Sequence, residues 1–281
     1  MKPRTIAQLV PAIDTQDGAG VRLRRALGAR PDQRLDPLLM LDAFSSDDPN
    51  DYIAGFPAHP HRGFETVTYI LDGHMLHEDH LGNRGDLMAG GVQWMTAGRG
   101  IIHSEMPQQT AGRLRGFQLW LNLPAREKMK PANYRDIPAA EIPAVTLADG
   151  TMIKVIAGRV QLAAREVQGP ITGGSTDPLY VDVSLAGDGR VTFPLPASHN
   201  ALVYVFEGTV KLNGSAIPNA TTAILSAGDG IELSADAGGG RCLVIAGKPL
   251  NEPVVQHGPF VMNTRAEIEQ AMRDYQSGHL A

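Results

Sequence analysis

The hydrophobic positions of the chain fall in short runs that turn-forming residues interrupt. In Val21–Arg25 apolar and charged residues alternate, which is typical of a strand whose covered face carries Val21 and Leu23. Continuous apolar runs that are short for helices predict further strands over 36–44, 117–123 and 241–246. Because 31 Gly and 20 Pro punctuate these runs, the pattern predicts an all-β fold rich in turns.

A helix is expected near the C-terminus. Thr264 and Glu267 have the spacing of a capping box, in which each side chain accepts a hydrogen bond from the other residue's backbone. Ile268, Met272 and Tyr275 follow at near-helical spacing, so the chain should end in one short amphipathic helix.

The second half of the chain repeats the first. When the hairpin turn Glu207–Gly208 is aligned with Asp72–Gly73, strand residues superpose, and Gly228–Asp229 then corresponds to Gly85–Asp86. The proline-rich segment 126–143 is interpreted as a linker. We therefore expect two copies of one β-domain, a metal-binding one over 1–135 and one without a metal site over 136–250, followed by a tail and helix over 251–281.

Composition and charge limit the possible partners and location. A net charge of -5 supplies no excess positive field, which argues against direct binding of nucleic acid or an anionic membrane. Cys242 is the single cysteine, so no intrachain disulfide can form, and no apolar segment approaches the roughly 20 residues that span a bilayer. We expect a soluble, cytoplasmic protein and, since two repeated domains in one chain bury their own interface, a monomer.

Two triplets carry the candidate chemistry. His59-Pro60-His61 and His103-Ser104-Glu105 each place two metal-type ligands two residues apart, and such residues share one face of a strand. Two strands side by side would direct four ligands at one point. Three imidazoles and a carboxylate suit a divalent transition metal, while a lone His-x-His pair is more often not a ligand pair.

Other titratable residues are weaker candidates. Continuing the parity of His61 predicts that Glu65 faces inward and that Thr66 and Thr68 face the other way. The spacing of His74, His77 and His80 suits neither a strand nor a chelate, so we expect them at the surface or pocket edge, with His77 nearest the site. His199 and Cys242 are interpreted as structural residues.

The motifs that hold these residues resemble the pirin family of bicupins. The resemblance lies in Gly55–Thr66, Gln93–Pro107, Gln256–Thr264 and Asp17–Arg25, and it extends over nearly the whole chain. It implies two cupin barrels packed face to face, with iron in the N-terminal one.

Position by position, the family's metal ligands fall on His59, His61, His103 and Glu105. Glu65, which would be the ligand in an ordinary cupin, is then expected to orient a ligand imidazole by accepting its remaining N–H. Fe(II) is the expected metal, and Ni, Cu, Mn or Co could occupy the same ligands.

The resemblance implies quercetin 2,3-dioxygenase activity. Glu105 would remove the proton of the flavonol 3-hydroxyl, dioxygen would add across C2 and C4, and the heterocycle would open with loss of carbon monoxide. Two alternatives stay open. The substrate could be another small enol, or the protein could be a metal- and redox-dependent regulator that binds a transcription factor or metabolic enzyme through Arg22, Arg24 and Arg25.

Overall fold

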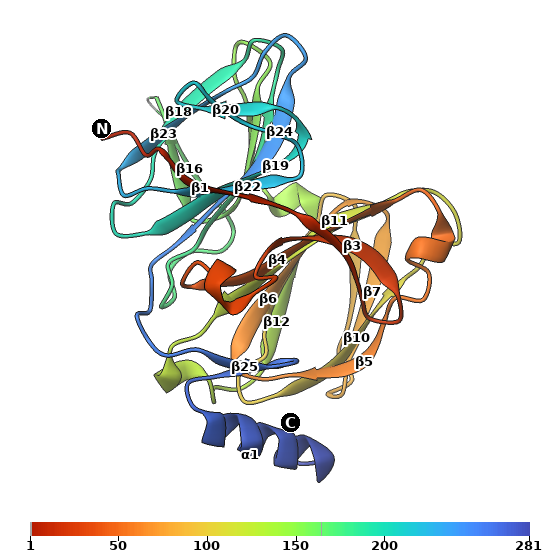
Figure 1. The fold of residues 1–281 in the computed structure, drawn as a ribbon. Coiled ribbons are helices and arrows are strands. Elements are labelled where there is room, and N and C mark those ends of the chain that lie inside the picture. The colour runs from red at the N-terminus through yellow and green to blue at the C-terminus, as the bar shows by residue number, and fades with distance from the viewer. Residues whose placement is uncertain (1, 164) are drawn as a thin grey trace. The chain divides into compact units, whose positions relative to one another are not determined.

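The computed structural model describes residues 2–163 and 165–281 and confirms an all-β chain with one C-terminal α-helix. The chain forms two compact units, each assembled from several segments (Figure 1). One, called the histidine unit, contains 14–25, 38–139 and 250–281; the other, called the valine unit, contains the N-terminal residues up to Ile13, 26–37 and 140–249. The expected domain boundaries after residues 135 and 250 stay a prediction.

The histidine unit contains a seven-stranded and a four-stranded antiparallel sheet. The larger has the order β12-β9-β6-β11-β4-β3-β2, formed by β2 (Ile13–Asp17), β3 (Val21–Leu27), β4 (Leu38–Ser46), β6 (Phe64–Asp72), β9 (Val92–Thr96), β11 (Leu114–Asn122) and β12 (Asn133–Ile137). The smaller has the order β5-β10-β7-β8, formed by β5 (Phe56–His61), β7 (His74–Asp79), β8 (Arg84–Met88) and β10 (Ile101–Pro107).

The valine unit repeats this plan strand for strand. Its larger sheet has the order β1-β22-β19-β24-β17-β14-β13, formed by β1 (Ile6–Pro11), β13 (Ala144–Thr146), β14 (Met152–Ala157), β17 (Leu179–Leu185), β19 (Asn200–Gly208), β22 (Thr221–Leu225) and β24 (Gly240–Gly247). Its smaller sheet has the order β18-β23-β20-β21, formed by β18 (Arg190–Pro194), β20 (Val210–Leu212), β21 (Ser215–Ile217) and β23 (Gly230–Ser234). The expected repeat of one β-domain is confirmed.

The valine unit is filled by hydrocarbon. Inward side chains of its two sheets meet in one buried apolar cluster, in which Val181, Val244 and Val203 form a row across neighbouring strands. Cys242 lies fully buried in the same cluster. Burial in these surroundings raises the pKa of its thiol, which supports the interpretation of an inert cysteine.

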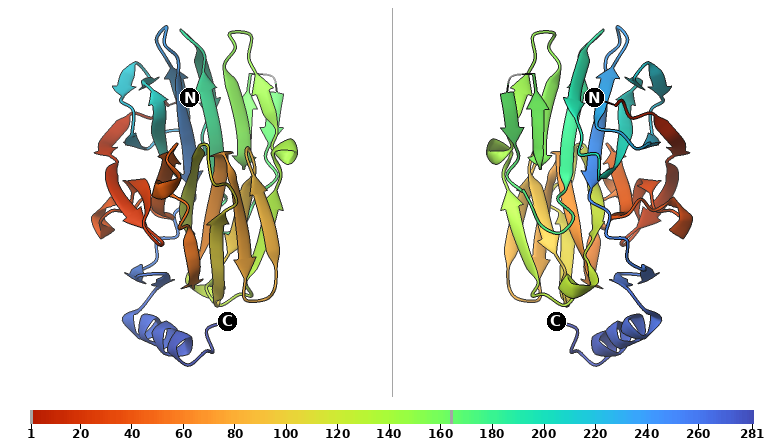
Figure 2. Two further views of the ribbon diagram at one scale, coloured as in Figure 1. Left: turned by 90° about the vertical axis from the view of Figure 1, so that its right-hand side faces the viewer. Right: turned by 90° about the vertical axis from the view of Figure 1, so that its left-hand side faces the viewer.

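The remaining elements are short. They are the hairpin strands β15 (Arg159–Leu162) and β16 (Arg165–Gln168), β25 (Val255–His257) and β26 (Phe260–Met262), the 3-10 turns η1 (Pro31–Gln33), η2 (Pro49–Asp51), η3 (Ala125–Glu127) and η4 (Ala139–Glu141), and the helix α1 (Arg265–Gln276). Thr264 and Glu267 form the predicted capping box at the start of α1. Figure 2 shows α1 beside the β25–β26 hairpin, at the end of the histidine unit. Within the described ranges no helix has the length and apolar character needed to cross a membrane.

The interpretation of 126–143 as a linker is wrong for its middle part. Asn133–Ile137 forms β12, which pairs in antiparallel register with β9 at the edge of the larger sheet. Exposed and covered side chains alternate along β12 and end at buried Ile137, a strand pattern that the surrounding prolines obscured. In the valine unit the corresponding edge position, beside β22, is taken by β1 from the N-terminal segment.

Candidate metal centre

The histidine unit encloses a cavity of about 630 Å³ between its two sheets. This volume lies within the usual range for small-molecule sites, roughly 300–1,000 Å³. Apolar side chains form much of its wall, and they are Leu23, Met40, Phe44, Phe56, Met75 and Trp120. Polar and charged side chains line the rest of the wall, and their positions define how a ligand could bind.

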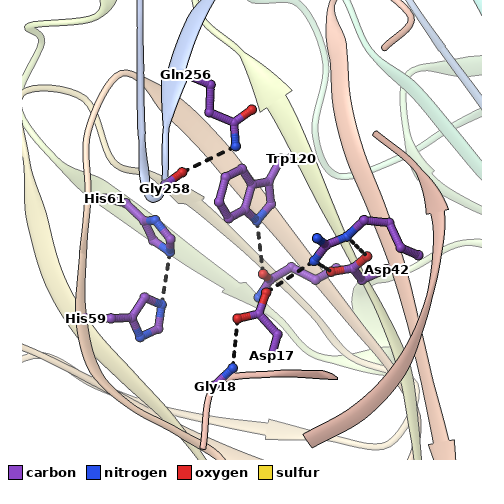
Figure 3. A network of polar contacts seen from close by, with 10 residues as sticks. Asp17, Gly18, Asp42, His59, His61, Trp120, Gln256 and Gly258 are labelled. Carbon is purple, nitrogen blue, oxygen red and sulfur yellow. Dashed lines mark hydrogen bonds and ion pairs between the residues drawn. The ribbon is translucent and has the colours of Figure 1, made fainter. Parts of the chain in front are cut away.

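Three imidazoles cluster here, and two of them, those of His59 and His61, line the cavity. His59 and His61 lie on β5, and His103 lies directly opposite His59 on the antiparallel strand β10. The ligand-type nitrogens of the three rings lie within 4.8 Å of one another. His61 also contacts the Trp120 ring edge-on, with 5.2 Å between ring centroids. Figure 3 shows the rings of His59 and His61 pointing at each other, with Trp120 in view between them and Asp42.

Hydrogen bonds indicate the tautomer of His59. Its Nδ1 lies 2.8 Å from the carbonyl oxygen of Pro57, which can only accept, so Nδ1 carries the proton and Nε2 presents a lone pair. The His59 Nε2 atom lies 3.0 Å from Nε2 of His61. Two nitrogens bound at about 2.1 Å to one metal at a right angle would be about 3 Å apart, so the spacing fits two adjacent ligands.

His103 supplies an independent sign of a missing partner. Its Nε2 is buried and has no hydrogen-bond partner among the described residues, while its Nδ1 lies 3.3 Å from Nδ1 of His77. Burial lowers the pKa of His61 and of His103 well below its ordinary value, and neighbouring imidazoles lower it further. Neutral imidazole is the form that binds metals. The three side chains therefore fit a divalent transition metal.

Glu105 lines the same cavity but lies outside the group of three histidines. Its carboxylate accepts hydrogen bonds from Oγ1 of Thr68 at 3.1 Å and from Nε2 of Gln118 at 2.9 Å. The indole N–H of Trp120 donates to Oε1 of Gln118 at 3.1 Å, which fixes the amide so that its NH₂ faces Glu105. The carboxylate thus lines the same cavity as His59 and His61 and is held by two donors.

The expected side-chain parity after His61 is wrong. Thr68 points into the cavity, whereas Glu65 accepts hydrogen bonds from Thr96 at 2.6 Å and Trp94 at 3.2 Å on the other face of β6. The chain bends at Gly63, where φ is +93° and a Cβ would collide with the Val261 carbonyl. Because β5 and β6 belong to different sheets, the alternation does not continue across this bend. That Glu65 orients a ligand imidazole stays a prediction without a contact to support it.

Lys128 fixes the bend that precedes β6. Its buried ammonium donates to the carbonyl oxygens of Gly63 at 2.7 Å and Val261 at 3.0 Å, and to Oδ1 of Asn122 at 2.7 Å. Burial lowers the pKa of Lys128 to about 8, so the side chain is still mostly protonated at neutral pH. The C-terminal hairpin is thereby tied to the backbone two residues from His61.

His74, His77, His80 and His199 have different surroundings. His77 is buried against His103 and the ring of Tyr134. His74 pairs with Asp86, and His80 accepts a hydrogen bond from the backbone of Ile102. His199 lies in the valine unit and contacts the carbonyl oxygen of Asp177 at 2.9 Å. His77 is therefore the one of these that adjoins a candidate ligand.

Sequence reasoning missed several polar residues of the cavity. Gln118 interrupts an apolar strand at an inward position, and this pattern could have identified it. Arg25, expected on a surface patch with Arg22 and Arg24, instead lines the cavity and pairs with Asp42. Its position follows from strand alternation, because Arg25 shares the covered face of β3 with Val21 and Leu23.

Comparisons with known proteins agree with this geometry. The chain matches the family profiles described as Pirin over residues 20–121 and Pirin C-terminal cupin domain over residues 180–281. It is 52% identical, over 99% of its length and 98% of the other chain, to a Pseudomonas aeruginosa protein provisionally named a quercetin 2,3-dioxygenase. It is 46% identical to a pirin-like protein of Caulobacter vibrioides over 99% of both chains.

A solved structure gives the same result. The crystal structure of a quercetin 2,3-dioxygenase from Acinetobacter baumannii is 34% identical, covers 99% of both chains and has a TM-score of 0.90. Because this similarity extends over both units, the expected pair of tandem cupin barrels is confirmed.

Proposed function

This chain belongs to the pirin family, and on that premise we propose that it is a metal-dependent dioxygenase that opens the heterocycle of quercetin or a related flavonol. The observation that carries the proposal is the cluster of His59, His61 and His103, two of which line a cavity with a partly apolar wall. The names of similar proteins support the same reaction class.

Each of the three imidazoles would bind the metal through Nε2, and Fe(II) is the metal we expect. When bound, the ion would polarise the substrate oxygen and hold substrate and dioxygen in one place. His77 would fix the ring of His103, because a ligand imidazole that binds through Nε2 donates from Nδ1 to a neighbour.

We assign to Glu105 the removal of the proton from the substrate hydroxyl. We also propose that the Glu105 carboxylate completes the set of metal ligands. Thr68 and Gln118 both donate to its carboxylate, so its oxygens are oriented before substrate enters. A base must lie within hydrogen-bond reach of the proton it removes. Gln118 is therefore a positioning residue that acts through Glu105.

The apolar wall would accept the flat rings of a flavonol and exclude water from the reacting carbons. A charged enolate would then meet the imidazoles and Glu105 in a medium of low polarity, where electrostatic interactions are stronger than in water.

The test is aerobic quercetin consumption by protein that has been reconstituted anaerobically with Fe(II). We expect loss of the flavonol absorbance together with release of carbon monoxide. His61→Ala should lose bound metal and turnover together. His199→Ala is the matched control, because it removes a buried imidazole from the valine unit.

Turnover without carbon monoxide would point to another oxygenase reaction on an enol. No turnover by protein that holds one equivalent of metal would overturn the dioxygenase proposal and favour a regulatory partner.

A cytoplasmic location and a monomeric state are also proposals, supported by the absence of cysteine pairs and by the two barrels in one chain.

A further inference from the structure

A second polar group lies in the wall of the same cavity. Arg25 donates from Nε to Asp42 Oδ1 at 2.9 Å and from Nη2 to Asp42 Oδ2 at 2.8 Å, which makes a bidentate ion pair. Its Nη2 also donates to Asp17 Oδ2 at 3.2 Å, and Asp17 Oδ1 accepts from the backbone N–H of Gly18 at 2.8 Å. All four residues line the cavity, and we call Arg25, Asp42 and Asp17 the acidic cluster (Figure 3).

The position of this cluster relative to Glu105 follows from strand register. Asp42 on β4 is paired with Gln118 on β11, which is paired with Thr68 on β6. Arg25 lies on β3, the next strand beyond β4. Neighbouring strands are about 4.8 Å apart, so Arg25 lies roughly 10 Å across the sheet from Gln118, which holds Glu105. A ligand of two or three linked rings could contact both ends.

The charge of the acidic cluster determines what it can bind. It combines one guanidinium with two carboxylates, and the side chain of Asp17 is 53% exposed whereas that of Asp42 is 5% exposed. A neutral hydroxyl can donate to Asp17, while a ligand carboxylate at the same place would meet net negative charge.

On the basis of the proposed function, we propose that the acidic cluster determines which flavonols bind. It favours flavonols whose pendant phenyl ring carries a hydroxyl group over flavonols that carry hydrogen or a carboxylate at the same place. The chemistry of this choice is the hydrogen bond from the phenol to Asp17, whose position Arg25 and Asp42 fix.

The alternative is that the pair only stabilises the fold, and the chain offers a matched comparison. Asp182 and Arg241 in the valine unit form a similar bidentate pair at 2.6 and 3.0 Å, with Asp182 equally buried. Asp182 lies between Val181 and Val183, which face the apolar core, so its side chain is on the opposite face of β17. Loss of that pair should affect stability alone.

The experiment measures affinity for three flavonols that differ only at the para position of the phenyl ring, which carries hydroxyl, hydrogen or carboxylate. Protein reconstituted with Zn(II) under argon binds without redox turnover, and binding is followed by calorimetry. We expect wild type to bind the hydroxyl compound about tenfold more tightly than the hydrogen compound, as one hydrogen bond to a charged group provides. The carboxylate compound should bind most weakly.

Two variants separate recognition from folding. Arg25→Met combined with Asp42→Leu replaces the ion pair by hydrocarbon and should bring the hydroxyl-to-hydrogen affinity ratio close to one. Asp17→Asn, at a half-exposed side chain, should fold normally and raise the relative affinity of the carboxylate compound several-fold. Asp182→Leu combined with Arg241→Met should leave all ratios as in wild type.

The outcomes distinguish this inference from the proposed function. Discrimination without turnover by the Fe(II) protein would overturn the dioxygenase and leave the acidic cluster as a recognition element. Turnover with equal affinity for all three compounds would overturn the inference alone. An unchanged ratio in both Arg25→Met/Asp42→Leu and Asp17→Asn would also overturn it, and no binding of any compound would overturn both.

Discussion

The two units have the same strand order and opposite interiors. The row Asp42, Gln118 and Thr68 crosses three neighbouring strands of the histidine unit. At the corresponding place in the valine unit the row is Val181, Val244 and Val203. The comparison shows that the centre of one β-framework can hold an apolar cluster or a cavity with polar groups, depending on which side chains face inward.

The difference has an energetic meaning. Buried valines contribute apolar area and need no partner, whereas each buried polar group must be hydrogen-bonded or it destabilises the fold. In the histidine unit connected contacts such as Thr68 to Glu105 and Trp120 to Gln118 meet that requirement for part of the interior. Nε2 of His103 is buried without a hydrogen-bond partner among the described residues, as expected of a metal ligand. The valine unit is thus suited to stability and the histidine unit to chemistry.

The largest expected effect comes from removing one of the candidate metal ligands, which distinguish the histidine unit from the valine unit. His103→Ala should lower metal affinity at least about 100-fold, because even residues that only support ligands contribute 10- to 100-fold. His199→Ala should retain one equivalent of metal. Metal content after gel filtration, measured by mass spectrometry, checks both, and equal metal loss in the two variants would contradict a site confined to the histidine unit.

A smaller effect is expected at the residue that positions Glu105. Gln118→Met removes the amide that donates to the carboxylate at 2.9 Å, so kcat should fall about tenfold while the bound metal is retained. Steady-state kinetics measures the change in kcat, and metal analysis of the same sample shows whether the metal is retained. A variant that keeps its rate would show that Gln118 does not act through Glu105.

Exchanging one residue of the two rows should sharpen the comparison. Val203→Thr places a hydroxyl in the apolar cluster and should lower the free energy of unfolding by about 1–3 kcal/mol. Thr68→Val should change it by about 1 kcal/mol, because the hydroxyl's hydrogen bonds with Glu105 and Gln118 are lost while Gln118 still donates to the carboxylate.

Different probes report on the two units in this exchange. Both tryptophans, Trp94 and Trp120, lie in the histidine unit, while the thiol of Cys242 lies in the valine unit. Urea unfolding followed by fluorescence and by thiol exposure therefore measures the units separately. Equal losses from Val203→Thr and Thr68→Val would contradict the contrast between the interiors.

The smallest effect concerns pH. Burial raises the pKa of Cys242, so above the ordinary thiol pKa the unfolded chain loses a proton that the folded chain keeps. Stability from this group is present below that pKa and declines as the pH rises. Relative to Cys242→Ala, wild type should lose about 0.7 kcal/mol between pH 8 and 9. Urea titrations at both pH values check this, and a constant difference would show that the thiol is not protected.

Much of the fold was predictable because strand alternation and turn residues are local signals. The helix after Thr264 and the strands around Val21, Leu41 and Leu243 were confirmed. The strand Asn133–Ile137 was not predicted, because it lies between Pro131 and Pro138 in the sequence and pairs with β9, which is distant along the chain. The N-terminal strand β1 also joins its sheet through a partner more than 200 residues away.

The candidate site was predictable in its histidines and less so in their surroundings. His59, His61 and His103 were predicted because the two ligand-type residues of each triplet lie on one strand. Pairing of β5 with β10 then brings the two triplets together. Thr68 was placed on the wrong face because parity cannot be followed through the bend at Gly63. The partnership of Arg25 with Asp42 depends on neighbouring strands, which no local pattern specifies.

The pairing of β1 with β22 has a consequence for synthesis on the ribosome. The first strand of the valine unit is made first, yet its partner Thr221–Leu225 is made near the end of the chain. Residues 6–11 must therefore wait, unpaired, while the segment 38–139 of the histidine unit is completed. If this strand were removed, the finished sheet would expose an open edge at β22 that could pair with another chain. We expect a truncation of the first twelve residues to form aggregates during expression, although it leaves every histidine of the metal centre in place.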